Sequence, residues 1–318
     1  MPFYRVRFKL NSAIVTPLKG DTIWGHIIWG IANHKGDEAV AKFLEQEKSV
    51  WPALPALVVS SAFPAGMVCR PIPLPADRKG RLTKKTYAEI KKDKEIKYVS
   101  ASKYFSNAET ENDDDEMKKK KQNPLESMLV IHNTIDRITN TVLEEKSPYT
   151  IEEKWPKIPK WDFYVLSSFS SERFLGHFGF GIKQIVEWAF ENGYGADAST
   201  GKGRINEIEE PVEVKPIKKQ ENTHYMALGP FVESGTALTD LRADIFVRSG
   251  KLGGAFTTRF SPYKKPVVLY DEGAVFKHDN DEPVQYVGKL LEGMHKENLS
   301  VCQSGFAPVI PVDPKEKP

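Results

Sequence analysis

Alternating and helical hydrophobic patterns divide the N-terminal two thirds of the chain into short elements. Strands are predicted where apolar and polar residues alternate, or where a short apolar run occurs, at residues 3–10, 56–63, 162–169 and 203–208. Helices are predicted where apolar residues recur at helical spacing, at residues 23–32, 37–47 and 181–192. Asp21 or Thr22 is expected to cap the first helix. With the residues between the second and third strands set aside as an insertion, the order is β-α-β-β-α-β, the ferredoxin-like unit.

The residues between 77 and 122 break this pattern. They are rich in Lys, and an acidic run that ends at Glu116 is followed by four consecutive lysines at residues 118–121. Such a composition does not form a packed core. We therefore predict an inserted arm over about residues 70–140 that is solvated when the protein is alone.

The chain after Pro211 is rich in strand patterns. Strands are predicted at residues 223–230, 243–249, 267–270, 274–276 and 301–310. Short helices are expected near Asp240 and between Lys289 and His295, and the tail from residue 311 is expected to be disordered. These patterns predict an N-terminal domain at residues 1–211 and a smaller, degenerate α+β domain at residues 212–318.

Composition limits the classes of partner and compartment. The net charge of +2 is close to zero, so nucleic-acid binding would need a local basic surface. Cys69 and Cys302 lie far apart with no pairing pattern, which argues against a disulfide framework or a zinc site and for a reducing compartment. No apolar run approaches about 18 residues, so we expect no membrane span and a cytoplasmic protein.

A glycine-rich loop (residues 193–204) is the strongest chemical signal in the chain. It reads Gly-Tyr-Gly-Ala-Asp-Ala-Ser-Thr-Gly-Lys-Gly-Arg and joins a predicted helix to a predicted strand. Glycines permit unusual backbone conformations, exposed N–H groups make an anion-binding concavity, and Lys and Arg add charge. A phosphate chain is therefore the predicted ligand, and Tyr194 is one aromatic on which a base could stack. Glycine spacing and the helix-then-strand order exclude a nucleotide-binding P-loop.

Two further segments carry candidate chemistry, each with two interpretations. His26, near the start of the first predicted helix, is either a general base against an RNA 2′-hydroxyl or a packed, hydrogen-bonded core residue. His132, Asn133 and Arg137 either contact phosphate, sugar and base edges, or form a polar turn that anchors the base of the arm. No catalytic constellation, cofactor motif or metal-ligand spacing is assembled, so we expect no catalytic residue, no cofactor and no metal.

Three segments together resemble the RAMP proteins of CRISPR effector complexes. They are residues 16–26 (Thr-Pro-Leu-Lys-Gly-Asp-Thr-Ile-Trp-Gly-His), residues 132–139 (His-Asn-Thr-Ile-Asp-Arg-Ile-Thr) and the glycine-rich loop. The combination is most similar to the fourth Csm-type subunit of type III-A complexes, as is Glu-Gly-Ala-Val-Phe at residues 272–276. The order of these segments is retained and they span most of the chain, whereas the Lys- and Asp-rich arm is the part least similar to the family.

This resemblance implies two ferredoxin-like RAMP domains and a non-catalytic role in antiviral defence. In that family the subunit holds the 5′ tag of the single-stranded CRISPR guide RNA, and a hairpin arm wedges near the start of the guide. The subunit contacts the large polymerase-like subunit and the backbone RAMP subunits. The expected RNA-binding residues are His26, His132, Asn133, Arg137, Gly193, Gly195, Ser199, Thr200, Gly201, Lys202, Gly203 and Arg204.

Two other functions are left open by the residues. One is a metal-independent RAMP endoribonuclease that processes CRISPR repeat RNA with His26 as its base. The other is an architectural protein that binds only partner subunits. Fold alone cannot separate these functions, because function depends on the site.

Overall fold

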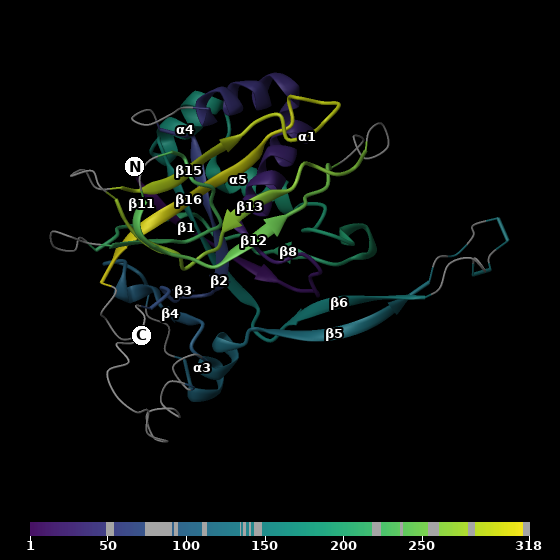
Figure 1. Ribbon diagram of the computed structural model, residues 1–318, viewed down its shortest axis with the longest axis horizontal. Helices are drawn as coiled ribbons and strands as arrows, with labels where there is room; N and C mark the ends of the chain where they lie inside the picture. The colour runs from purple at the N-terminus through teal and green to yellow at the C-terminus, as the bar shows by residue number, and fades with distance from the viewer. Residues whose placement is uncertain are drawn as a thin grey trace.

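Two β-sheets packed face to face form the body of the protein, with helices on the outer side of the first sheet (Figure 1). The computed structural model describes residues 1–48, 54–73, 91, 95–109, 113–133, 135, 138–139, 141–142, 148–217, 224–235, 238–253, 261–278 and 284–313. No helix within these ranges has the length and apolar character needed to cross a membrane.

The first sheet has the ferredoxin-like order that the hydrophobic pattern predicts. Its elements in chain order are β1 (Phe3–Leu10), α1 (Gly20–Glu47), β2 (Leu57–Pro64), β7 (Lys160–Ser167), α5 (Ile182–Phe190) and β8 (Ile205–Asn206). The strands lie in the order β2-β7-β1-β8, and all neighbouring pairs are antiparallel. A further strand, β9 (Val212–Val214), pairs with the first half of β1. The prediction of an α+β ferredoxin-like fold is confirmed.

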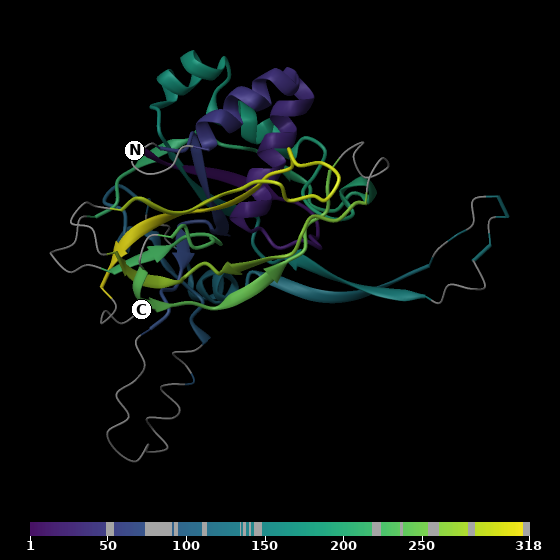
Figure 2. The same cartoon turned by 45° about the horizontal axis from the view of Figure 1, so that its top comes forward.

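The helices differ from prediction in their boundaries. The two helices expected at residues 23–32 and 37–47 form the single helix α1, with a kink at Gly36, whose φ is 78°. The helix begins at Gly20 with Lys19 at its N-cap, so the expected cap at Asp21 or Thr22 is wrong. Helix α4 (Ser171–Phe178) was not predicted, although Ser170 caps its first turn and Gly179 ends it. It packs near α1 and α5 and is gathered with them at one end of the molecule (Figure 2).

The first hydrophobic core lies between this sheet and its helices. Alternate residues of β1, including Val6 and Phe8, point into it and meet Ile27 and Ile31 of α1 and Phe190 of α5. Alternation on a half-buried strand and a 3.6-residue repeat on a helix are the patterns that such packing requires.

The second sheet contains more strands than the sequence predicts. Its order is β11-β14-β10-β16-β15, formed by β11 (Leu238–Arg242), β14 (Val275–His278), β10 (His224–Ala227), β16 (Gln303–Val312) and β15 (Tyr286–Leu291). A separate ribbon joins β12 (Ile245–Arg248) to β13 (Val267–Tyr270). The helix expected near Asp240 is therefore wrong, because this residue lies in β11. The helix expected from Lys289 is also wrong, since Lys289 lies in β15.

The C-terminal tail is also more ordered than expected. Strand β16 continues through Pro311 and Val312, although disorder was expected from residue 311. Val312 is buried and pairs with His224. Residues 314–318 lie outside the described ranges.

The second sheet closes the inner face of the first. Phe3, Val58 and Leu166 of the first sheet share a buried cluster with Met226 and Ile310 of the second. Three small elements cover the rest of this face: β3 (Met67–Cys69), β4 (Tyr98–Ser100) and the 3₁₀ turn η1 (Ala101–Lys103). RNA-recognition domains with such a sheet stack bases on this open face. Here the face is buried, so it is closed to RNA.

A long hairpin projects from the body (Figures 1 and 2). Its strands are β5 (Leu125–His132) and β6 (Tyr149–Pro156), paired in full register from Leu125 opposite Pro156 to His132 opposite Tyr149. The projecting element therefore overlaps only the end of the predicted arm. Part of the Lys- and Asp-rich segment is also packed, because Lys121 of α3 (Asp115–Gln122) is buried and Met117 packs against the first core.

We expect the stability of the fold to decrease with rising pH because of Glu47. This carboxyl is fully buried at the end of α1, where it accepts a hydrogen bond from the Leu57 N–H at 2.9 Å. Burial raises the pKa of Glu47 well above its ordinary value of 4.5. Below pH 4.5 both the folded and unfolded states hold the proton, so the full contribution to stability is present there. Above it only the unfolded chain ionises, and stability falls by about 1.4 kcal/mol per pH unit until the folded-state pKa is passed.

Urea unfolding from pH 5 to 8 measures this effect in wild type and in Glu47→Gln. Gln cannot ionise and keeps the oxygen that accepts from Leu57. We expect the stability of the variant relative to wild type to rise across this range. Equal pH slopes for the two proteins would contradict a protonated, buried Glu47.

Candidate nucleic-acid interface

The glycine-rich loop lies between α5 and β8, and its glycines are required by backbone geometry. All four glycines have positive φ, between 64° and 93°. A Cβ at Gly203 would overlap the backbone of Tyr194, and one at Gly195 would lie 2.6 Å from the Thr16 Cβ. Asp197 also has a positive φ of 59°, at the start of the 3₁₀ turn η2 (Ala198–Thr200). The loop is therefore a fixed structure rather than a variable connection.

Segment 11–17 holds the loop through its backbone amides. The Ala196 N–H donates to the Thr16 hydroxyl at 2.9 Å, the Gly203 N–H to the Ala13 carbonyl at 2.7 Å, and the Arg204 N–H to the Ser12 hydroxyl at 2.8 Å. The Gly195 N–H donates to His26 at 3.1 Å. Most of the amides predicted to face an anion are thus used to fix the loop. Within the part of the chain that the structure describes, three amides of the loop have no hydrogen-bond partner, those of residues 197–199.

His26 contacts the glycine-rich loop through its imidazole ring. Its Nε2 accepts the Gly195 N–H, and its ring lies 4.9 Å from the ring of Tyr194. Burial lowers the pKa of His26 below its ordinary value, so the neutral, accepting form is favoured. Tyr194 is completely buried and donates its hydroxyl to the Pro17 carbonyl at 2.6 Å. The suggestion that a base stacks on Tyr194 is therefore wrong.

Lys202 joins the loop to the projecting hairpin. Its ammonium lies 2.6 Å from Oε1 of Glu153 on β6 and 5.4 Å from the ring centroid of Trp155. The Glu153 side chain is only 3% exposed, so this ion pair is largely removed from water. The neighbouring side chains of Ser199, Thr200 and Arg204 are exposed. Of the predicted phosphate-binding side chains, Lys202 is thus already paired, whereas Arg204 faces solvent.

The second predicted RNA-binding segment lies at the outer end of the hairpin rather than at its base. His132 is the last residue of β5 and stacks on Tyr149 with ring centroids 5.7 Å apart. Asn133 follows and is exposed, and Arg137 lies outside the described residues. Met128 lies opposite Glu153, the residue that contacts the glycine-rich loop through Lys202. His132 is four residues further along β5, a distance of about 13 Å on a strand. The structure therefore does not bring this segment together with the glycine-rich loop.

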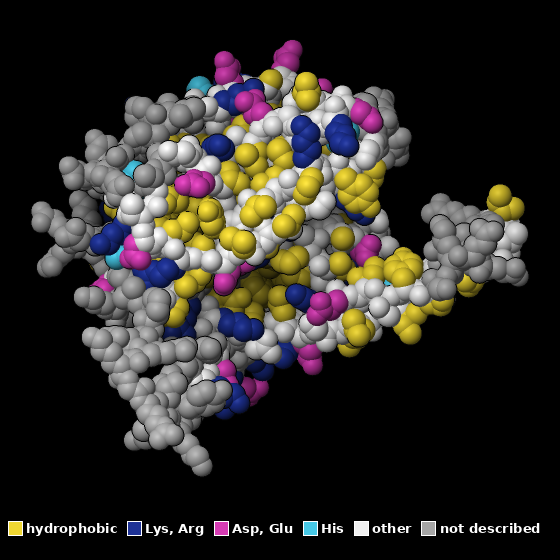
Figure 3. Space-filling view, viewed as in Figure 1, with side chains coloured by type: hydrophobic (Ala, Val, Ile, Leu, Met, Phe, Trp, Pro, Cys, Tyr) yellow, Lys and Arg dark blue, Asp and Glu magenta, His cyan; other side chains and the backbone are white. Residues whose placement is uncertain are grey.

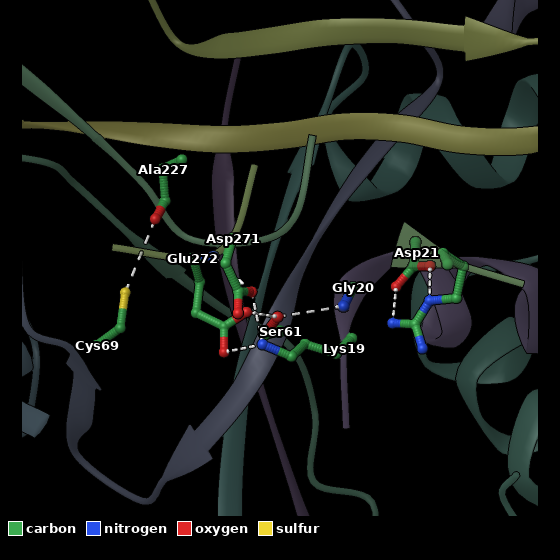
Figure 4. A network of polar contacts seen from close by, with 9 residues as sticks. Lys19, Gly20, Asp21, Ser61, Cys69, Ala227, Asp271 and Glu272 are labelled. Carbon is green, nitrogen blue, oxygen red and sulfur yellow. Dashed lines mark hydrogen bonds and ion pairs between the residues drawn. The ribbon is translucent and has the colours of Figure 1, made fainter. Parts of the chain in front are cut away.

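The segments at residues 16–26 and 272–276 meet where the start of α1 lies against the turn between β13 and β14 (Figure 4). The Lys19 ammonium lies 2.5 Å from Oδ1 of Asp271 and 2.6 Å from Oε1 of Glu272. The Ser61 hydroxyl donates to Oε2 of Glu272 at 3.0 Å. Burial raises the pKa of Glu272 to about 7, and Lys19 opposes that rise. This polar cluster holds α1 against the turn between β13 and β14.

Apolar side chains are exposed along the hairpin, and a hollow with hydrophobic side chains lies beside its root (Figure 3). Met128 is 54% exposed, Leu129 72% and Ile131 70%. Two-stranded hairpins are marginally stable alone in water, and exposed apolar patches mark interaction surfaces. Sequence analysis missed Glu153 and Trp155, because no local pattern links them to Lys202.

Known proteins match this chain in fold, whereas the comparisons of its sequence found no match. No protein-family model matches the chain, and no curated protein matches it. A chain of a Csm1–Csm4 cassette in complex with AMPPNP has a TM-score of 0.57 and 14% identity, and the match covers 98% of both chains. A chain of a Csm3–Csm4 subcomplex in the type III-A CRISPR-Cas interference complex has a TM-score of 0.53 and 14% identity, covering 98% of this chain and 100% of that one. Because Csm4 is common to both, this chain has the fold of a Csm4-type RAMP subunit.

Proposed function

We propose that this chain is a non-catalytic, RNA-binding subunit of a type III-A CRISPR effector complex. It binds the 5′ tag of the guide RNA at the glycine-rich loop and docks the large polymerase-like subunit and the backbone RAMP subunits. The observation that carries this proposal is the match in fold over 98% of the chain to two solved structures. One is a complex of Csm1 with Csm4, and the other is a complex of Csm3 with Csm4. The sequence motifs that resemble the same family support it independently.

The geometry of the loop favours a single RNA strand as its ligand. The inner face of the first sheet is buried, and the glycine-rich loop lies at an accessible edge of that sheet. At this edge Ser199 offers a hydroxyl and Arg204 offers a guanidinium, both exposed, whereas the Thr200 hydroxyl already donates to the Asp197 carbonyl at 2.8 Å. Guanidinium groups bind phosphate oxygens in a bidentate way, and a rigid loop loses little entropy when it binds.

The placement of His26 favours a binding role over the endoribonuclease alternative. A general base must have a free lone pair directed at the substrate hydroxyl. The Nε2 lone pair of His26 instead accepts the Gly195 N–H, and its ring packs against Tyr194. We therefore assign His26 to shaping the RNA-binding loop.

The exposed hairpin supports docking to protein partners. Its apolar side chains on both faces, including Leu129 and Ile131 on one face and Met128 on the other, are exposed in the isolated chain. An interface with partner subunits would bury this area and stabilise the hairpin.

Ultraviolet crosslinking in the assembled complex tests the proposal. The chain is assembled with its Csm-type partner subunits and a guide RNA, and crosslinked peptides are mapped by mass spectrometry. We expect crosslinks from residues 193–204 to the first nucleotides of the guide. Crosslinks confined to the 3′ end, or none from this chain while its neighbours crosslink, would overturn the assignment.

Two variants make the test quantitative. Arg204→Ala is expected to weaken binding of single-stranded RNA and to reduce the slope of log K against log salt by about 0.7, because one phosphate contact is lost. Arg173→Ala, an exposed arginine on α4, is the matched control and should leave both quantities unchanged. Unchanged affinity in Lys202→Ala with Arg204→Ala would favour the architectural alternative. Cleavage of repeat RNA in EDTA that is lost in His26→Ala would favour the nuclease.

A further inference from the structure

We propose that Trp155, at the root of the projecting hairpin, is a stacking platform for one base of the RNA strand at the glycine-rich loop. This inference rests on the proposed RNA-binding function and names a residue of that site that no sequence motif marks. Trp155 lies on β6 directly after Lys154 and is 42% exposed. A large aromatic side chain with this exposure, beside a loop that carries the exposed Arg204, is the type of group on which single-stranded RNA stacks its bases.

The contacts of Trp155 place it at the loop rather than along the free part of the hairpin. The Lys202 ammonium lies 5.4 Å from the centre of its ring. Lys202 closely follows Ser199 in the loop, and the Ser199 side chain is exposed. A strand whose phosphates lie along this part of the loop would carry its bases within reach of the indole ring.

The body of the protein fixes the backbone on both sides of Trp155. On one side of Trp155, the Ile14 N–H donates to the Lys154 carbonyl at 2.9 Å and the Lys154 N–H donates to the Ile14 carbonyl at 2.8 Å. On the other side, the Lys157 N–H donates to the Pro124 carbonyl at 2.8 Å. The Glu153–Lys202 ion pair adds a third attachment at 2.6 Å. A platform held in this way needs little ordering when a base arrives, which favours binding.

The Glu153–Lys202 ion pair also explains why Trp155 and Lys202 would contribute base stacking to RNA binding rather than a phosphate contact. Lys202 is partly neutralised by the buried Glu153 carboxylate, so it adds little charge for a phosphate. Its main effect is to hold the loop against β6 and to place a cation beside the indole, an arrangement that stabilises the ring position. Trp155 then supplies the part of the affinity that does not depend on charge.

Binding of single-stranded RNA to the full chain tests the inference with three variants. Fluorescence anisotropy with a 3′-labelled RNA measures the dissociation constant of wild type, Trp155→Ala, Trp155→Phe and Leu129→Ala over a range of salt concentrations. We expect Trp155→Ala to weaken binding roughly tenfold with an unchanged salt slope, and Trp155→Phe to recover most of the loss. Leu129→Ala removes a more exposed apolar side chain from the opposite face of the same hairpin and should bind as wild type.

The outcomes separate this inference from the proposed function. If Arg204→Ala weakens binding but Trp155→Ala binds within about twofold of wild type, stacking on Trp155 is overturned and the RNA-binding function stands. If Trp155→Phe is as weak as Trp155→Ala, stacking is likewise overturned. If wild type binds no RNA, alone or in the assembled complex, the proposed function itself fails. Should a variant fold poorly, the crosslink map of wild type decides, because an RNA adduct on Trp155 is expected and its absence beside adducts on residues 193–204 contradicts the inference.

Discussion

Replacing Asp162 with alanine is expected to lower the free energy of unfolding by about 3 kcal/mol, because the buried Arg7 loses its bidentate carboxylate and keeps the weaker pair with the exposed Glu109, whose Oε2 lies 3.5 Å from Nη1. Asp162 on β7 is completely buried and binds Arg7 of β1 in a bidentate pair, at 2.7 Å to Nε and 2.9 Å to Nη2. It also accepts the Gly66 N–H at 2.7 Å. Arg7 is 6% exposed, so water cannot replace the lost carboxylate.

Urea unfolding of Asp162→Ala and Glu210→Ala measures this difference. Glu210 makes an ion pair of the same 2.7 Å length with Lys183, but its side chain is 77% exposed. Exposed pairs contribute about 0–1 kcal/mol, so we expect little change in Glu210→Ala. If the two variants lost similar stability, the burial of the Arg7–Asp162 pair would not be the cause.

Replacing Gly203 with alanine is expected to disrupt the glycine-rich loop and to cost about 4 kcal/mol of stability, the sum of left-handed backbone strain and steric overlap. Gly203 has a φ of 64°, and a Cβ there would overlap the carbonyl oxygen of Tyr194. The same residue accepts the Tyr194 N–H at 2.9 Å and donates to Ala13 at 2.7 Å. Relief of the overlap would therefore break the contacts that close the loop. RNA binding should be lost together with stability.

Gly201→Ala is the matched control for this variant. Gly201 lies in the same loop with a φ of 93°, but an added Cβ there meets no atom within 4 Å. Only the backbone strain applies, so we expect a loss of about 1–2 kcal/mol. Thermal unfolding and RNA anisotropy on both variants make the comparison, and equal losses would argue against close packing at Gly203.

The elements that were predicted well are those whose signal is contained in a few neighbouring residues. Strand β1 was predicted with its observed limits, because its alternating residues face one core and one closed face. Helix α5 has an apolar stripe at helical spacing and was off by two residues or fewer at each end. The glycine-rich loop was recognised because positive φ at four positions requires glycine, and this requirement is visible in the sequence.

The elements that were missed depend on distant partners. Tyr286–Leu291 contains adjacent apolar residues that also suit a helix, and only its pairing with β16 makes it strand β15. Strand β5 has apolar residues on both faces, so it lacks the alternation of a half-buried strand. Its form is set by pairing with β6, which begins only at Tyr149.

For this protein the sequence alone determined the ferredoxin-like order of the first sheet and the position of the glycine-rich loop, because both arise from local periodicity and local backbone requirements. The tertiary structure decided which groups of that loop are available. It paired Lys202 with Glu153, buried Tyr194, engaged His26 with the Gly195 amide and exposed Trp155 beside the loop. These outcomes follow from contacts between residues far apart in the chain, whose register is set only when the two sheets and the hairpin pack together.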